Sequence, residues 1–108
     1  LQGMRSANND QYRLRYSTGP ATIELAIESS GHSRHIEGEI YANDDQADLL
    51  SDTGPALITL LHHGQIIAET ISDLDGRFDF ADLNAADYAM TFFLGDTARI
   101  ELVAVNVS

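Results

Sequence analysis

The chain has 108 residues, 44% of them apolar, and a formal net charge of -11, which fits one domain with a modest core that needs no disulfide. Its six cations are all arginines, scattered and outnumbered by 17 acidic residues, so we expect neither nucleic acid nor an anionic membrane surface as a partner. Without lysine or cysteine the chain has no Schiff-base, Walker-lysine or thiolate chemistry, and its cellular compartment stays open.

A short polar lead-in precedes one β-rich domain. Residues 1–10 lack apolar periodicity and predict a flexible arm, whereas residues 11–108 form the single domain. Apolar and polar side chains first alternate with a period of two, which predicts half-buried antiparallel strands. Gly38 takes an inward position, where a glycine indicates a bulge or a close backbone approach. The strands predicted here span residues 11–16, 21–29 and 35–42.

An acidic segment and a hairpin follow. Residues 43–54 are rich in aspartate and turn formers, and they make the longest predicted loop. Two apolar strands come next, joined by His62-His63-Gly64, in which Gly64 supplies the positive φ that a short hairpin loop requires. The two strands of this hairpin span residues 56–61 and 65–72.

The last part of the chain predicts three more strands. A turn at residues 73–76 leads to alternation that places Phe78 and Phe80 in the core. In the final strand, residues 98–107, the inward positions include Ala104. With strands also at residues 77–80 and 88–93, the count is seven or eight, without a convincing amphipathic helix. This pattern is typical of an all-β antiparallel sandwich.

Several segments of the C-terminal two thirds, roughly, resemble the carboxypeptidase regulatory-like family. The resemblance implies a seven-stranded Greek-key sandwich of the transthyretin-like type, used as a non-catalytic accessory module. The segments are Gly38-Glu39-Ile40, Ala56-Leu57-Ile58-Thr59-Leu60, Ile66-Ile67-Ala68-Glu69-Thr70, Asp73-Leu74-Asp75-Gly76-Arg77-Phe78-Asp79-Phe80-Ala81-Asp82-Leu83 and Tyr88.

Two further comparisons with that family concern the N-terminal part and the segment before Tyr88. Residues 3–28 look like the lead-in of bacterial proteins of unknown function that carry the module. Where the family has a Pro-Pro-Gly-like turn before its tyrosine, this chain has residues 84–87. Asn84 or Asp87 is therefore the expected site of a left-handed backbone.

Clustered aspartates are the candidate calcium ligands, because hard cations bind several carboxylate oxygens from one loop. Asp73 and Asp75 lie in the turn, and Asp44 and Asp45 in the acidic loop. The spacing around the turn does not match an EF-hand, since Gly76 falls at position four and no late glutamate follows. We therefore favour a structural turn and a solvated loop, with no metal or other cofactor.

No motif in the chain predicts catalysis. The sequence has no Gly-x-Ser-x-Gly elbow, no His-Glu-x-x-His and no glycine-rich phosphate loop. We expect exposed positions in turns for the four histidines, His32, His35, His62 and His63. We therefore do not expect an enzyme.

The remaining functions are binding and structure. We expect a non-catalytic module that associates with a protein partner or neighbouring domain, or acts as a spacer, in a larger bacterial protein; residues 99–107, as an apolar edge strand, predict a weak homodimer. A carbohydrate-binding module is one alternative, in which Tyr12, Tyr16, Tyr41 or Phe93 stacks on sugars. A calcium-stabilised surface domain is the other.

Overall fold

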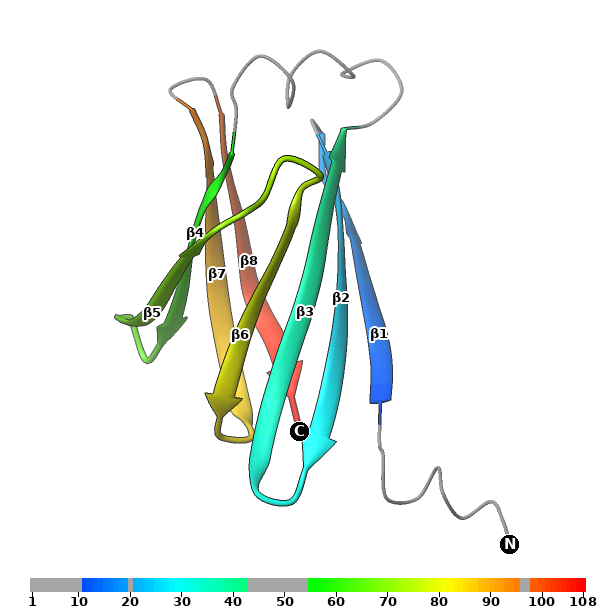
Figure 1. Cartoon of the computed structure of the whole chain (residues 1–108). Coiled ribbons are helices and arrows are strands. Elements are labelled where there is room, and N and C mark those ends of the chain that lie inside the picture. Colours follow the sequence, from blue (N-terminus) through cyan, green and yellow to red (C-terminus); the bar gives the residue numbers. More distant parts are fainter. Residues whose placement is uncertain (1–10, 20, 43–54, 96–97) are drawn as a thin grey trace, which may run out of the picture.

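The computed structural model describes residues 11–19, 21–42, 55–95 and 98–108, and these form eight antiparallel strands in two sheets (Figure 1). The all-β sandwich predicted from the alternation is confirmed. The expected arm at residues 1–10 and the expected loop at residues 43–54 lie outside the described residues. The strands are β1 (Gln11–Ser17), β2 (Ala21–Ser30), β3 (Ser33–Ala42), β4 (Leu57–His62), β5 (Gln65–Ile71), β6 (Arg77–Leu83), β7 (Ala86–Leu94) and β8 (Ala98–Val107).

Each sheet has four strands. Sheet A has the order β1-β2-β3-β6, and sheet B has the order β5-β4-β7-β8. The edge strands are therefore β1 and β6 in sheet A, and β5 and β8 in sheet B. Within the described residues, no helix is long and apolar enough to cross a membrane.

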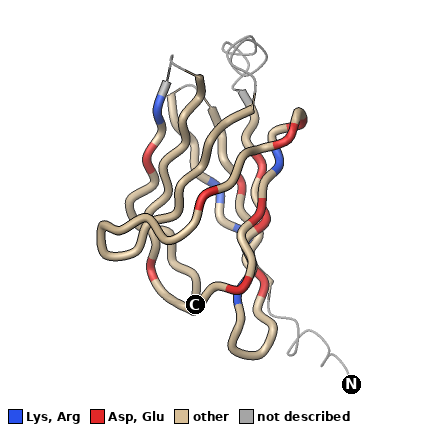
Figure 2. Tube along the Cα trace, turned by 60° about the vertical axis from the view of Figure 1, so that its left-hand side comes forward, with Lys and Arg blue, Asp and Glu red and all other residues tan. Residues whose placement is uncertain are grey.

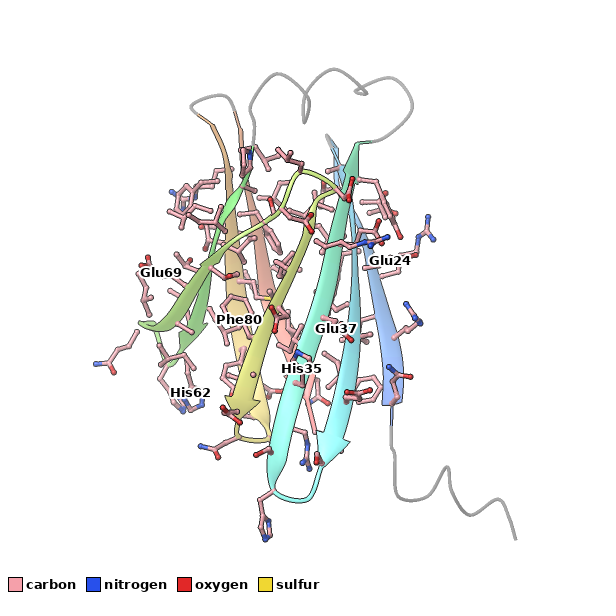
Figure 3. The ribbon with its side chains drawn as sticks, in the orientation of Figure 1. Glu24, His35, Glu37, His62, Glu69 and Phe80 are labelled. Carbon is pink, nitrogen blue, oxygen red and sulfur yellow. The ribbon has the colours of Figure 1, made fainter. Side chains whose placement is uncertain are left out.

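The core lies between the two sheets and consists of the inward side chains of their strands. Ile23, Leu25 and Ile27 of β2 are fully buried, as their alternation predicts. The rings of Phe78 and Phe92 meet edge to face across the sheets, with centroids 5.7 Å apart. Figure 3 shows Phe80 in the same layer. The sandwich therefore has one continuous apolar core.

The predicted hairpin between β4 and β5 is confirmed. Its loop is His63-Gly64, and both residues have positive φ, 52° and 78°. This is the pattern of a type I′ turn, whose twist matches that of the paired strands. The left-handed backbone expected at Gly64 is present, and His63 has a left-handed backbone as well.

At Gly38 the sequence-based expectation is wrong. The ladder is regular there, because Gly38 pairs directly with Phe78 of β6. A Cβ added to Gly38 would lie only 2.1 Å from Cζ of Phe78. The glycine therefore makes room for an aromatic ring, and neither a bulge nor a backbone approach explains it.

The bulge in sheet A lies near the end of β6. The three residues of β3 from Arg34 to Ile36 oppose the four residues of β6 from Phe80 to Leu83. Asp82 absorbs the extra residue with a φ of 58°. The left-handed backbone expected at Asn84 or Asp87 is thus at Asp82, which an aspartate tolerates better than most residues.

The corner at Tyr88 forms despite the unusual sequence before it. The Tyr88 hydroxyl donates a hydrogen bond to the carbonyl oxygen of Asn84 at 2.6 Å, and the ring is buried. This is the arrangement of a tyrosine corner, in which the hydroxyl holds the connection between strands of opposite sheets.

A second bulge, in β8, corrects the expected inward position of Ala104. Tyr88 and Met90 of β7 oppose Val105 and Leu102, so β8 contains one residue more than its partner. Val103 and Ala104 are consequently both exposed. After the bulge the alternation returns, and Val105 is fully buried.

Candidate functional site

The turn that carries two of the calcium candidates is closed by its own carboxylate. Oδ1 of Asp73 accepts hydrogen bonds from the backbone N–H groups of Asp75 and Arg77, both at 2.9 Å. The Asp73 carbonyl accepts a third from Gly76 at 3.0 Å. Asp73 therefore acts as a turn cap. The other candidates, Asp44 and Asp45, lie outside the described residues.

Gly76 docks this turn on β3. Its φ is 81°, and a Cβ added there would lie 2.4 Å from the carbonyl oxygen of Ile40. The Gly76 carbonyl accepts a hydrogen bond from the Ile40 N–H at 2.9 Å. The Asp-Gly pair therefore has a structural explanation in backbone geometry.

His32 and His63 lie exposed in turns as expected, whereas His35 and His62 do not. His35 lies on β3 and is half-buried, with Nε2 3.1 Å from Asp79 and Nδ1 3.8 Å from Glu28. His62 is also half-buried, and its ring packs against Tyr88 at a centroid distance of 5.4 Å. In the part of the chain that the structure describes, no three His, Asp or Glu side chains converge as metal ligands.

The outer surface of sheet A, which we call the charged face, is covered by ionisable side chains. Strand register places them in rows, one of which contains Arg15, Glu24, Glu39 and Arg77. The Arg15 guanidinium lies 2.7 Å from Glu24. The full set comprises Arg13, Arg15, Glu24, Glu28, His35, Glu37, Glu39, Arg77 and Asp79.

Tyr41 also lies on the charged face. Its hydroxyl donates a hydrogen bond to Glu24, and this bond, with smaller effects from desolvation and nearby carboxylates, raises the pKa of Tyr41 above 10.0. A shallow groove of about 340 Å³ crosses the face at Ala26, where the outward side chain is small. Carboxylates and guanidinium groups line it, so opposite charges largely neutralise one another there.

The aromatic side chains form no exposed platform among the described residues. Tyr12, Tyr16, Tyr41 and Phe93 are each half-buried. The Tyr12 hydroxyl donates to the carbonyl oxygen of Asn106 at 2.7 Å and accepts the N–H of Ser108 at 3.0 Å. These bonds tie β1 to the end of β8. The stacking surface that a carbohydrate module uses is thus absent from the described part of the chain.

The outer surface of sheet B is mainly apolar, and we call it the apolar face. One row, set by the strand register, contains Ile71, Leu57 and Phe93. In the other apolar row, Leu61 pairs with Ile66 of β5 and with Ala89 of β7. The full set comprises Leu57, Leu61, Ile66, Ile67, Ile71, Ala89, Phe93 and Val103. A polar row of Glu69, Thr59, Thr91 and Glu101 separates the two.

One end of the apolar face is hollowed. The depression has a volume of about 350 Å³, and it is lined by Leu61, Ala89 and Val103 together with residues of the β4–β5 hairpin. The bulge in β8 shapes it, because Val103 is turned outward and is 82% exposed. The Asp87 carboxylate lies on its rim and accepts a hydrogen bond from the Asn106 side chain.

Strand β5 borders the apolar face and is poorly covered. Most of its residues are exposed, including Ile66 at 57% and Ile71 at 65%. Ile66 and Ile67 lie together where the β4–β5 register shifts, opposite Leu61. The sequence signal for this surface was the adjacent Ile66-Ile67 pair, which breaks the alternation. The apolar pattern of this segment predicts no more than one strand of a hairpin.

No protein-family model, curated protein or solved structure matches this chain. The resemblance to the carboxypeptidase regulatory-like family therefore remains a prediction from the sequence.

Proposed function

We propose that this chain is a non-catalytic β-sandwich module that binds a protein partner or a neighbouring domain through the apolar face of sheet B. The observation that carries the proposal is the contrast between the two outer faces. The charged face of sheet A suits water, whereas contiguous exposed apolar side chains mark interaction sites on soluble proteins.

The distribution of exposed apolar side chains supports this choice. Among the described residues, the exposed large hydrophobics are Leu57, Ile66, Ile67, Ile71, Leu74 and Val103. All but Leu74 belong to the apolar face. A module that served only as a spacer would have no physical reason to gather them on one sheet, because exposing apolar surface costs about 25 cal/mol per Å².

The chemistry of the described residues favours a protein over a sugar as the ligand. The apolar face offers branched aliphatic side chains and a depression suited to an apolar side chain, as protein interfaces do. Sugars are bound by flat exposed rings and converging polar groups. The resemblance of residues 38–88 to an accessory-module family supports the same role, within a larger bacterial protein.

The test is a selection of displayed random heptapeptides on the purified chain, with a glycan array in parallel. The double variant Ile66→Ser/Ile71→Thr removes apolar area from the face. The control Arg13→Ser/Glu37→Thr changes the charged face, where neither residue forms an ion pair with a described residue, and it too preserves the net charge.

We expect enriched peptides that bind the parent chain and the control equally and that bind the double variant at least tenfold more weakly. Melting curves confirm that both variants fold. Equal binding to the double variant, or no enrichment, would overturn the proposal. Binding on the glycan array alone would support the carbohydrate-binding alternative.

Self-association is the second part of the proposal. The C-terminal strand β8, predicted to mediate a weak homodimer, is an edge strand of sheet B. We expect light scattering to show a mass that rises between micromolar and millimolar concentration, more strongly at high salt because salt screens the net charge of -11. A monomeric mass over the whole range would count against the dimer.

A further inference from the structure

We infer that the partner binds as an extended strand along the free edge of β5, and that the side chains it adds to the apolar face are apolar except for one basic residue opposite Glu69. This inference rests on the proposed function of the apolar face, and it specifies the conformation and the side chains with which the partner binds there.

The first argument is the backbone of β5. Among the described residues, this strand pairs in sheet B with β4 alone, so on its other side every second residue presents an N–H and a C=O without a partner in the described sheet. Such an edge accepts a strand from another chain by main-chain hydrogen bonds. The bulge at Ile66 and Ile67 lies at the hairpin end, which leaves residues 68–71 as a regular stretch.

The second argument compares β5 with the other edges. Charged side chains and bulges protect edge strands from pairing with other chains. Strand β1 carries Arg13 and Arg15, and β8 carries Arg99 and Glu101 as well as a bulge, which limit pairing along β8 to the weak self-association proposed above. Strand β6 carries one basic and two acidic residues and a bulge. Strand β5 has Glu69 as its one charged residue.

The two open sides of the sandwich differ in how firmly the sheets are joined. On the side of β1 and β8, the Tyr12 hydroxyl forms hydrogen bonds with the end of the chain after β8, and the Arg34 guanidinium donates to the carbonyl of Ser108 at 3.2 Å. Those contacts bridge the two sheets. On the β5 side, Figure 1 shows β5 leaning away from β6 toward its hairpin, which projects from the sandwich. Within the described part of the chain, the edge therefore opens toward the hairpin.

The charge of β5 indicates which polar side chain of the partner fits beside it. No Lys or Arg occurs between Arg34 and Arg77, and Glu69 is the one charged residue of β4 and β5. Figure 3 shows Glu69 pointing away from the sandwich, and Figure 2 shows the stretch of the trace around the hairpin without basic residues. A lysine or arginine of the partner, placed opposite Glu69, makes the favourable cross-strand pair.

The same charges argue against a second copy as the occupant. A copy that added its own β5 would bring two Glu69 side chains to one short ladder, and each chain has a net charge of -11. Like charges on neighbouring strands destabilise the pairing. A partner with apolar and basic side chains gains on both counts.

The experiment uses the capped heptapeptide Thr-Val-Thr-Lys-Thr-Val-Thr as the lysine–valine probe, because its lysine lies between two valines on one face of an extended strand. Its controls are the same peptide with glutamate for lysine, and an analogue in which every second backbone amide is N-methylated to remove donors along one edge. Affinity is measured by calorimetry, and amide hydrogen exchange locates the contact. The variant Glu69→Lys is compared with Glu37→Lys, which makes the same charge change on the charged face.

We expect the lysine–valine peptide to slow exchange at amides within residues 68–71. N-methylation should weaken binding about tenfold or more, since each lost hydrogen bond costs about a factor of five. Glu69→Lys should weaken binding more than Glu37→Lys does. Equal binding of the N-methylated peptide overturns strand addition but leaves the proposed function intact. If the lysine–valine peptide does not bind, this inference is overturned, whatever the displayed library selects. The proposed function fails by a different result: the library yields no enriched peptide, or its peptides bind the double variant as well as the parent chain.

Discussion

Replacing Gly38 by alanine should destabilise the sandwich, because the Phe78 ring occupies the space of the new methyl group. The added Cβ would lie 2.1 Å from Cζ and 2.6 Å from both Cε atoms of Phe78. The ring is 6% exposed and packs on Phe92, so it has little room to move. Overpacking of a core costs about 1–3 kcal/mol. The lower chain entropy of alanine in the unfolded state offsets about 0.4–1 kcal/mol of this.

The expected net loss is about 1.3 kcal/mol, equivalent to a drop in melting temperature of about 8 °C for a domain of this size. Chemical and thermal unfolding measure it. The control is Gly19→Ala, since an added Cβ at Gly19 has no atom within 4 Å and its φ lies outside the left-handed region. Combining Gly38→Ala with Phe78→Leu should reduce the cost of the alanine. An equal cost in both backgrounds would show that the ring is not the cause.

Three further predictions concern the corner, the charged face and the turn. Tyr88→Phe should cost about 1 kcal/mol in urea unfolding, because the buried ring stays while the hydrogen bond to Asn84 is lost; an unchanged midpoint would contradict the corner. The raised pKa of Tyr41 means that its neutral form is favoured in the fold. The contribution of Tyr41 to stability is therefore fully present below pH 10 and is lost as the pH rises through the folded pKa. Tyr41→Phe should flatten the decline of the free energy of unfolding between pH 9 and 11. A decline parallel to that of the parent chain would refute this. Melting curves in millimolar calcium and in excess chelator should coincide, since the Asp73 carboxylate already caps its turn; a calcium-dependent rise would support the calcium-stabilised alternative.

The strands were predictable because their alternation is local. Each strand that the structure describes overlaps a predicted one, and the inward positions of β2 and β6 were identified. The errors arise where position depends on a neighbouring strand. Whether Gly38 meets a ring or a backbone is decided by the residue opposite it on β6, and Ala104 is turned outward by a bulge relative to β7.

The candidate site was less predictable for the same reason. The sequence pattern of an apolar strand is the same whether the strand lies in the centre or at the edge of a sheet. The sequence of residues 65–71 therefore did not show that β5 is an edge strand. The two apolar rows join residues of β4, β5 and β7 that are distant in sequence. For the aspartates, the sequence favoured a structural turn over a calcium site, and the Asp73 carboxylate closes that turn in the structure.

The central claim is that the apolar face of sheet B is the binding surface, and amide resonance mapping tests it most directly. The ¹⁵N-labelled chain is titrated with the lysine–valine heptapeptide, and the perturbed amides are assigned. The account predicts perturbations concentrated in β5 and in the neighbouring strand β4. Perturbations confined to the charged face of sheet A, or spread evenly over both sheets, would contradict it.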